Sequence, residues 1–208
     1  MNTRTARAGF TLIELLAVLL ILSILVGILV TSLGGAEDAT QQSLTENFIA
    51  QIEVALSEYE IENGDYPRSS FGPGLDLAAN EMNVGAEALV VAFFSGGWEA
   101  AGAVADDRLG NSDGDRSKKS LTDFGSRDLF EIMDSWDNPI AYFHHSEYGR
   151  PQWYTTFDTA TGEPIETEVH ARTTATTQRL RNPRSFQLIS AGLDGRFGTE
   201  DDLGNWSE

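Results

Sequence analysis

Gly9-Phe10-Thr11-Leu12-Ile13-Glu14 opens the stretch of sequence that decides the fold. The apolar run that it begins extends from Phe10 to Leu33, contains 24 residues, and has Glu14 as its single charged side chain. As a helix rising about 1.5 Å per residue, the run is about 36 Å long, enough to cross a hydrocarbon core of about 30 Å. An ionisable residue inside a span is costly and usually has a functional partner. The sequence therefore predicts a membrane-spanning helix in which Glu14 has a specific role.

The charges that flank the run predict its orientation. Arg4 and Arg7 precede the run, whereas Glu37 and Asp38 follow it, so the short leader is expected in the cytoplasm and the body of the chain outside. An ordinary secretory signal peptide is disfavoured because its apolar region is usually about 7 to 15 residues long. A carboxylate interrupts the run here, and small residues suited to cleavage come only at 34–36.

The six opening residues resemble the processing signal of the type IV pilin-like superfamily, which includes type IV pilins and type II secretion pseudopilins. The resemblance implies that a prepilin peptidase cuts between Gly9 and Phe10 and that the new amino terminus, Phe10, is methylated. Glu14 then becomes the fifth residue of the mature chain, where the resemblance implies a role in assembly.

The helix is expected to continue beyond the membrane run. Apolar residues recur at helical spacing among polar ones, at Leu44, Phe48, Ile52, Ala55, Leu56 and Tyr59. Asn63 and Gly64 provide a carboxyl-terminal stop, and Pro67 prevents further continuation. We therefore predict one helix from about Phe10 to Glu62, with a transmembrane half and an amphipathic half.

Length and composition limit the remainder of the chain to one domain. The predicted parts are a cleaved leader at 1–9, a transmembrane and filament-core helix at 10–33, and a periplasmic globular domain at 34–208 that includes the amphipathic helix to about residue 63. Lys and Arg total 14 against 32 Asp and Glu, a net charge of −18, which disfavours nucleic acid as a partner.

Turn-forming and β-prone residues predict a small sheet in this domain. The turn formers at 137–139 precede aromatic and β-branched runs at 140–145 and 152–157, which predict a hairpin, and 186–189 is expected to add a third strand. The segments 61–67 and 134–140 also resemble the helix-ending and turn signatures of major pseudopilins.

Two further segments carry weaker signals. The 11 apolar residues from Val84 to Phe94 are too few to cross a membrane and predict a buried helix. Gly162 to Pro183 is rich in Thr, Glu and Arg and is interpreted as a polar surface excursion without reliable periodicity.

An enzyme is disfavoured by the motifs. His144 and His145 are adjacent on a predicted strand, so we expect their side chains on opposite faces and no shared metal. The sequence has no nucleophile elbow, no HExxH and no phosphate-binding glycine loop.

The carboxyl-terminal tail is the candidate metal site. The chain has no cysteine, so no disulfide can pin its loops. Asp194, Glu200, Asp201 and Asp202 lie in a glycine-rich stretch that ends at 204–206, and they supply the carboxylate oxygens that Ca²⁺ prefers. A solvated acidic turn is the alternative.

This tail resembles the calcium loop that ends the major pseudopilin of the type II secretion system. Carried over, Asp194 is the aspartate of the Asp-Gly turn, Asp202 is the aspartate two residues before the closing glycine, and Asp201 is a third ligand. Glu200 and the carbonyl of Leu193 are further candidates. The implied cofactor is a structural Ca²⁺.

A second acidic turn, Asn111-Ser112-Asp113-Gly114-Asp115, has the alternating oxygens of a calcium loop. It lacks the bidentate glutamate that an EF-hand loop has at its twelfth position. We interpret it as a solvated turn, with a second calcium loop as the open alternative.

The predicted fold is α+β and type IV pilin-like: a long amino-terminal helix packed on a small antiparallel sheet, with a calcium-bound carboxyl-terminal loop. The resemblance implies a major-pseudopilin-like subunit that assembles from the bacterial inner membrane into a periplasmic pseudopilus. Implied partners are the prepilin peptidase, copies of the chain in a helical filament, minor pseudopilins and the inner-membrane secretion platform. Two alternatives stay open: a pilin or minor pilin of a surface or DNA-uptake fibre, and a membrane-tethered calcium-binding hydrolase.

Overall fold

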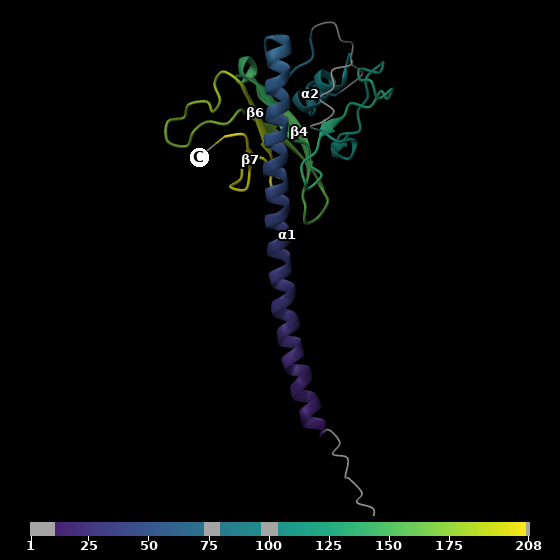
Figure 1. Ribbon diagram of the computed structural model, residues 1–208, viewed down its shortest axis with the longest axis vertical. Coiled ribbons are helices and arrows are strands. Elements are labelled where there is room, and N and C mark those ends of the chain that lie inside the picture. The colour runs from purple at the N-terminus through teal and green to yellow at the C-terminus, as the bar shows by residue number, and fades with distance from the viewer. Residues whose placement is uncertain (1–10, 73–79, 97–103, 207–208) are drawn as a thin grey trace, which may run out of the picture. The chain divides into compact units, whose positions relative to one another are not determined.

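The computed structural model describes residues 11–72, 80–96 and 104–206, and the chain divides into two compact units, Met1–Thr40 and Gln41–Glu208. Helix α1 is continuous over the 52 residues Leu12–Asn63 (Figure 1). It ends at Gly64, whose φ of 82° is the left-handed conformation that commonly terminates helices, and the Gly64 N–H donates to the Glu60 carbonyl at 2.7 Å. The prediction of one long helix is confirmed.

Within the described residues, no helical stretch combines the length and the apolarity that crossing a membrane requires. The predicted span at 10–33 includes Phe10, which lies outside the described residues, and 29–33, whose side chains are not described. The span remains a prediction.

The second half of α1 buries a stripe of side chains at helical spacing. The buried apolar members are Phe48, Ile49, Ile52, Ala55 and Leu56. The predicted core position Leu44 is wrong, because its side chain is 45% exposed and Thr45 is fully buried instead. Thr45 Oγ1 accepts a hydrogen bond from the Ser135 N–H at 3.2 Å, so a polar contact to the loop before β3 replaces the expected apolar one.

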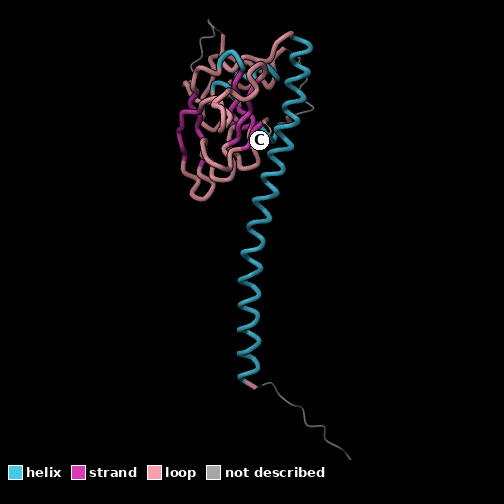
Figure 2. Tube along the Cα trace, turned by 90° about the vertical axis from the view of Figure 1, so that its left-hand side faces the viewer, coloured by secondary structure: helices cyan, strands magenta, loops and turns pink. Residues whose placement is uncertain are grey.

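Among the described residues, three small antiparallel sheets follow α1, where the sequence predicted one. The first pairs β1 (Leu109–Gly110) with β2 (Glu131–Ile132). The second has the order β3 (Ala141–His144), β6 (Phe186–Ser190) and β7 (Leu203–Gly204), and the third pairs β4 (Gln152–Phe157) with β5 (Pro164–Val169). The other elements are α2 (Val84–Phe94), η2 (Asp106–Arg108) and η3 (His145–Glu147). Long loops connect these short strands (Figure 2).

The predicted hairpin between 140–145 and 152–157 is wrong, although both strands exist. β3 pairs with β6, and β4 pairs with β5. Side chains occupy the edge of β3 that would have met β4: the Tyr142 N–H donates to the Tyr154 hydroxyl at 3.1 Å, and the Tyr142 carbonyl accepts from Gln152 Nε2 at 3.2 Å. The ladder is therefore replaced by side-chain hydrogen bonds.

The polar excursion predicted at 162–183 is wrong in part, because it contains strand β5. Burial alternates along β5, with Ile165 and Thr167 more buried than their neighbours and Val169 fully so. This is the period of a strand with one covered face. The sequence Pro164–Val169 has this alternation, but six residues are too few to distinguish a strand from a polar loop.

Two buried clusters form the core of the unit Gln41–Glu208. One joins α1 and α2 to β3 and β6, and Tyr142 and Leu188 are among its members. The other contains Phe143 and Ile189 from the same two strands. Successive residues of a strand point to opposite faces, so the β3–β6 pair is buried on both faces. In Figure 1 the end of α1 passes beside β6 and β7. The predicted buried helix Val84–Phe94 is confirmed as α2.

Candidate functional site

Glu14 forms a capping box at the start of α1. The Thr11 N–H and hydroxyl donate to Glu14 Oε2 at 2.8 and 2.7 Å, and the Glu14 N–H donates to Thr11 Oγ1 at 3.3 Å. This reciprocal pair satisfies backbone groups that a helix start leaves unpaired, and it places a negative charge where the helix dipole favours one. Gly9 and Phe10 lie outside the described residues. The Glu14 carboxylate is thus held by Thr11, the residue that directly follows the predicted new amino terminus.

The closing Gly204-Asn205-Trp206 binds the tail to the domain. β7 pairs with β6, and Asn205 Oδ1 accepts from the Leu188 N–H at 2.9 Å. Asn205 Nδ2 donates to Glu53 Oε1 of α1 at 3.1 Å, and the Arg181 guanidinium lies over the Trp206 ring at 5.3 Å. The acidic segment is therefore a loop whose two ends are fixed on adjacent strands.

Two glycines allow this loop to fold back on itself. Gly192 and Gly195 have φ values of 65° and 70°. A side chain at Gly192 would overlap the Asp201 carbonyl, and one at Gly195 would overlap the Phe157 carbonyl. Asp201 Oδ2 accepts from the Asp194 N–H at 2.9 Å. The loop thus brings Asp194 and Asp201 together.

Oxygen atoms of this loop converge on the hydroxyl of Thr199. Its Oγ1 lies 3.5 Å from Asp194 Oδ1 and 3.1 Å from the Arg196 carbonyl, and it also contacts Asp201 Oδ1. A hydroxyl donates one hydrogen bond, so it cannot satisfy all three acceptors. A Ca²⁺ ion accepts six to eight such oxygens at about 2.3 to 2.6 Å, and these residues fit it. Sequence reasoning missed Thr199 and the Arg196 carbonyl.

The other three predicted ligands are placed differently. The Asp202 side chain is 8% exposed, forms an ion pair with Arg172, and accepts from the Gly198 N–H at 3.0 Å. Burial raises the pKa of Asp202 to about 6. Glu200 is exposed, and the Leu193 carbonyl accepts a hydrogen bond from the Thr159 hydroxyl. For Asp202 to bind a cation, it must exchange the Arg172 contact for the ion.

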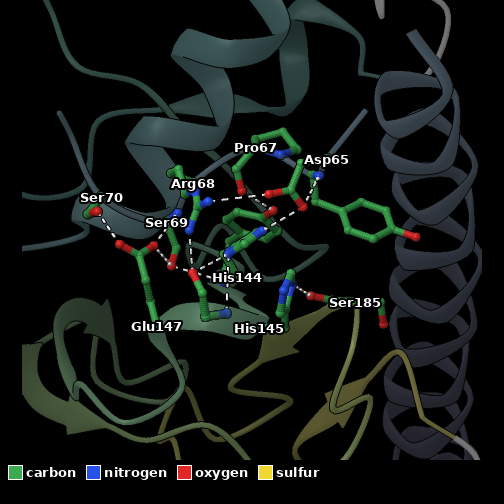
Figure 3. Close-up of polar contacts among 12 residues, drawn as sticks. Asp65, Pro67, Arg68, Ser69, Ser70, His144, His145, Glu147 and Ser185 are labelled. Carbon is green, nitrogen blue, oxygen red and sulfur yellow. Dashed lines mark hydrogen bonds and ion pairs between the residues drawn. The ribbon is translucent and has the colours of Figure 1, made fainter. Parts of the chain in front are cut away.

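A polar network that sequence reasoning missed joins the segment after α1 to the end of β3 (Figure 3). Glu147 Oε2 accepts from the Ser69 N–H and hydroxyl, both at 2.8 Å, and Ser69 Oγ accepts from the His144 N–H at 3.0 Å. Asp65 Oδ1 lies 3.2 Å from His144 Nε2. Because the paired residues are about 75 to 80 positions apart in sequence, no local sequence pattern predicts the network.

The expectation that His144 and His145 point to opposite faces is wrong. β3 ends at His144 and the chain turns into η3 at His145, so the alternation of a strand stops there. The two rings lie 4.2 Å apart between centroids, and Asp65, His144 and His145 offer ligand atoms within 4.8 Å of one another. Both nitrogens of His144 already have partners, Asp65 and Ser146, and burial lowers its pKa. We therefore interpret the group as a clamp on the helix-ending segment.

Comparison with known proteins agrees with the processing signal. Residues 4–30 match the prokaryotic N-terminal methylation motif. The chain is 25% identical over 202 residues to type II secretion system core protein G of Aeromonas hydrophila, which covers 97% of this chain and 93% of that protein. It is 24% identical over 207 residues to the core protein G of Escherichia coli K12, covering 99% and 95% of the two chains. No solved structure matches significantly.

A third relative, core protein G of Vibrio cholerae, is 37% identical over 73 residues, 35% of this chain and 49% of that protein. The methylation motif, the long capped helix followed by small antiparallel sheets, and the full-length similarity point the same way. Together these findings support a type IV pilin-like pseudopilin.

Proposed function

We propose that the chain is a structural subunit of a type II secretion pseudopilus, of the major pseudopilin kind. The observation that carries the proposal is similarity along nearly the whole chain to two core G proteins of type II secretion systems, together with the methylation motif at 4–30. Its relatives are core proteins of a secretion system, and the chain is a structural protein rather than an enzyme.

The subunit would act by assembly. A prepilin peptidase would cut between Gly9 and Phe10, and the helix at 10–33 would anchor the subunit in the inner membrane with its body in the periplasm. The apolar side chains described between Leu12 and Ile28 are 50 to 83% exposed, which suits a segment that is covered first by lipid and then by neighbouring copies. Copies of the chain, minor pseudopilins and the inner-membrane platform would be its partners.

We also propose that the tail binds a structural Ca²⁺. Asp194 and Asp201 would supply carboxylate oxygens beside Thr199, and Asp202, Glu200 and the Leu193 carbonyl are the further candidates. The ion would neutralise like charges that otherwise repel, and the loop has no disulfide to hold it. Gly192 and Gly195 allow the loop to fold back on itself, and Asn205 fixes its end on β6.

Processing is the first test of the function. The mature protein should begin at Phe10 with a methylated amine, as measured by intact mass on protein purified from membranes of a strain that has a prepilin peptidase. Gly9→Val should stay uncut because the larger side chain crowds the peptidase site. A mature start at Met1 or near residue 36 would refute the pseudopilin assignment. Filaments on the cell surface instead of a periplasmic pseudopilus would favour the pilin alternative.

A further inference from the structure

Four carboxylates gather beneath the amino-terminal end of α2. Glu87 lies in the first turn of α2, Glu131 lies on β2, and Asp113 and Asp115 lie in the turn at 111–115. Oxygen atoms of Glu87, Asp113 and Glu131 all lie within 4.8 Å of one another. We call these four residues the acid cluster. Its members come from three separate elements, so only the folded chain assembles it.

Two members of the acid cluster are fully buried, and most carboxylate oxygens of Glu87, Asp113 and Asp115 lack hydrogen-bond partners. Glu87 and Glu131 are fully buried. Neither oxygen of Glu87 has a partner, nor do Asp113 Oδ2 and the two carboxylate oxygens of Asp115. The ion pairs between described side chains include none of the four residues. An unpaired buried carboxylate is strongly unfavourable, and native proteins rarely keep one without a ligand.

The residues around the acid cluster hold it in place without neutralising it. Glu131 Oε1 accepts from Asn83 Nδ2 at 2.9 Å, and its Oε2 accepts from the Ser112 N–H at 3.0 Å. In the turn, Asn111 Oδ1 accepts from the Gly114 N–H, and Asn111 Nδ2 donates to the Asp115 carbonyl, each at 2.8 Å. The turn predicted as solvated is therefore closed by its own hydrogen bonds, while its two aspartates are half-buried.

Two arrangements can relieve such a cluster: added protons or a bound cation. Burial and the neighbouring carboxylates raise the pKa of Glu87 to about 10, and burial raises the pKa of Glu131 to about 8. A proton on Glu87 can serve one oxygen at most. A divalent cation can contact one oxygen each of Glu87, Asp113 and Glu131 at once, since these oxygens lie within 4.8 Å of one another, so it relieves more of the cost than a proton does.

We propose that the acid cluster is a second Ca²⁺ site, formed by Glu87, Asp113, Asp115 and Glu131. The ligands are all hard oxygens, which suit Ca²⁺, and they include no imidazole or thiolate that would favour zinc. Mg²⁺ keeps several of its waters and demands octahedral geometry, so it fits a buried set of side chains from separate elements less well. The site would tie α2 and β2 to the turn at 111–115. It stands independently of the proposed function and of the tail.

Calcium binding to the full chain in detergent, after treatment with chelator, tests this site. Isothermal titration calorimetry should find one Ca²⁺ per chain in an Asp194→Ala parent, whose tail site is disabled. Adding Glu87→Gln or Asp113→Asn should weaken that binding at least about tenfold, whereas Asp107→Asn, an exposed aspartate of η2, should leave it unchanged. Mg²⁺ should bind the parent at least about tenfold more weakly. Equal calcium affinity in Glu87→Gln and Asp107→Asn would overturn the proposal.

Melting curves provide a readout that a purely structural cluster would not give. Glu87→Gln keeps the shape of the side chain and removes a buried carboxylate, so in chelator this variant should melt at or above the temperature of its parent. In millimolar Ca²⁺ the parent's melting temperature should rise and that of the variant should not. An equal rise in both would reject the site. If Glu87→Gln does not fold, Asp115→Asn, at a half-buried position, takes its place with the same two outcomes.

Discussion

At the residue scale, Glu14 has a local role that the structure shows, and we expect it to have a separable role in assembly. The local role is the capping box with Thr11. The expected assembly role is to pair with the methylated amine of Phe10 on a neighbouring subunit. The two differ in what they require: capping needs a hydrogen-bond acceptor, whereas pairing needs a negative charge.

Glu14→Gln separates these roles because glutamine also closes a capping box. We expect Glu14→Gln and Glu14→Leu to be inserted and cut normally, and both to form far fewer filaments than the wild type. Electron microscopy of filaments and intact mass of the membrane fraction measure the two steps. Normal filaments from Glu14→Gln, with few from Glu14→Leu, would assign the role to capping and refute the charge pairing.

Asp134 is a buried acceptor on which the turn before β3 depends. Its Oδ1 accepts from the Trp136 and Asn138 N–H groups at 2.9 and 3.0 Å, and its Oδ2 accepts from Ser190 Oγ at 2.6 Å. Asp134→Ala leaves these donors unpaired, and each unpaired buried group costs about 1 to 3 kcal/mol. The free energy of unfolding should fall by about 2 to 4 kcal/mol, as measured by urea unfolding of the full chain. An unchanged midpoint would contradict this role.

The same residue predicts a pH dependence. Burial raises the pKa of Asp134 to about 6 from an ordinary value of 3.8. Between these values the unfolded chain has lost the proton and the folded chain retains it, so this group's contribution to stability is present below about pH 4 and is lost as pH rises to about 6. Asp134→Asn should flatten that part of the curve of stability against pH. A curve identical to wild type would show that Asp134 does not cause the slope.

At the scale of elements, the tail loop depends on two glycines that need both a positive φ and the absence of a side chain. Gly195 meets both conditions, whereas Gly198 has a φ of 102° but open space around it. Gly198→Ala should therefore cost only the strain of a left-handed backbone, about 1 to 2 kcal/mol. Gly195→Ala adds an overlap with the Phe157 carbonyl and should lower the melting temperature further. Equal losses would show that the loop moves away from β4 without cost.

For the whole molecule, calcium should contribute to folding stability through the tail. At free Ca²⁺ one hundred times the dissociation constant, a site stabilises the folded chain by about 2.7 kcal/mol. Asp194→Ala and Asp202→Ala should each remove the tail's share of the calcium-dependent rise in melting temperature and weaken filament formation. Asp107→Asn is the control. Wild-type melting curves that coincide in chelator and in millimolar Ca²⁺ would rule out structural calcium in this chain.

The sequence by itself determined the features that depend on neighbouring residues. Apolar periodicity and the Asn63-Gly64 stop predicted one long helix, and the apolar run at 84–94 predicted α2 with its observed bounds. The strands at 140–145, 152–157 and 186–189 were located correctly because β-branched and aromatic residues mark them locally. The processing motif and the tail signature likewise reside in short, contiguous stretches.

Only the tertiary structure decided which strands pair and which distant side chains meet. β3 does not pair with β4 because the side chains of Tyr154 and Gln152 form hydrogen bonds with the Tyr142 backbone. Local strand propensity does not predict this outcome. The acid cluster likewise draws on α2, β2 and a turn up to 44 positions apart in sequence. Such contacts depend on packing around the whole core, where burial changes the hydrogen-bonding needs and the pKa of each group, and a single sequence records the residues but not their neighbours.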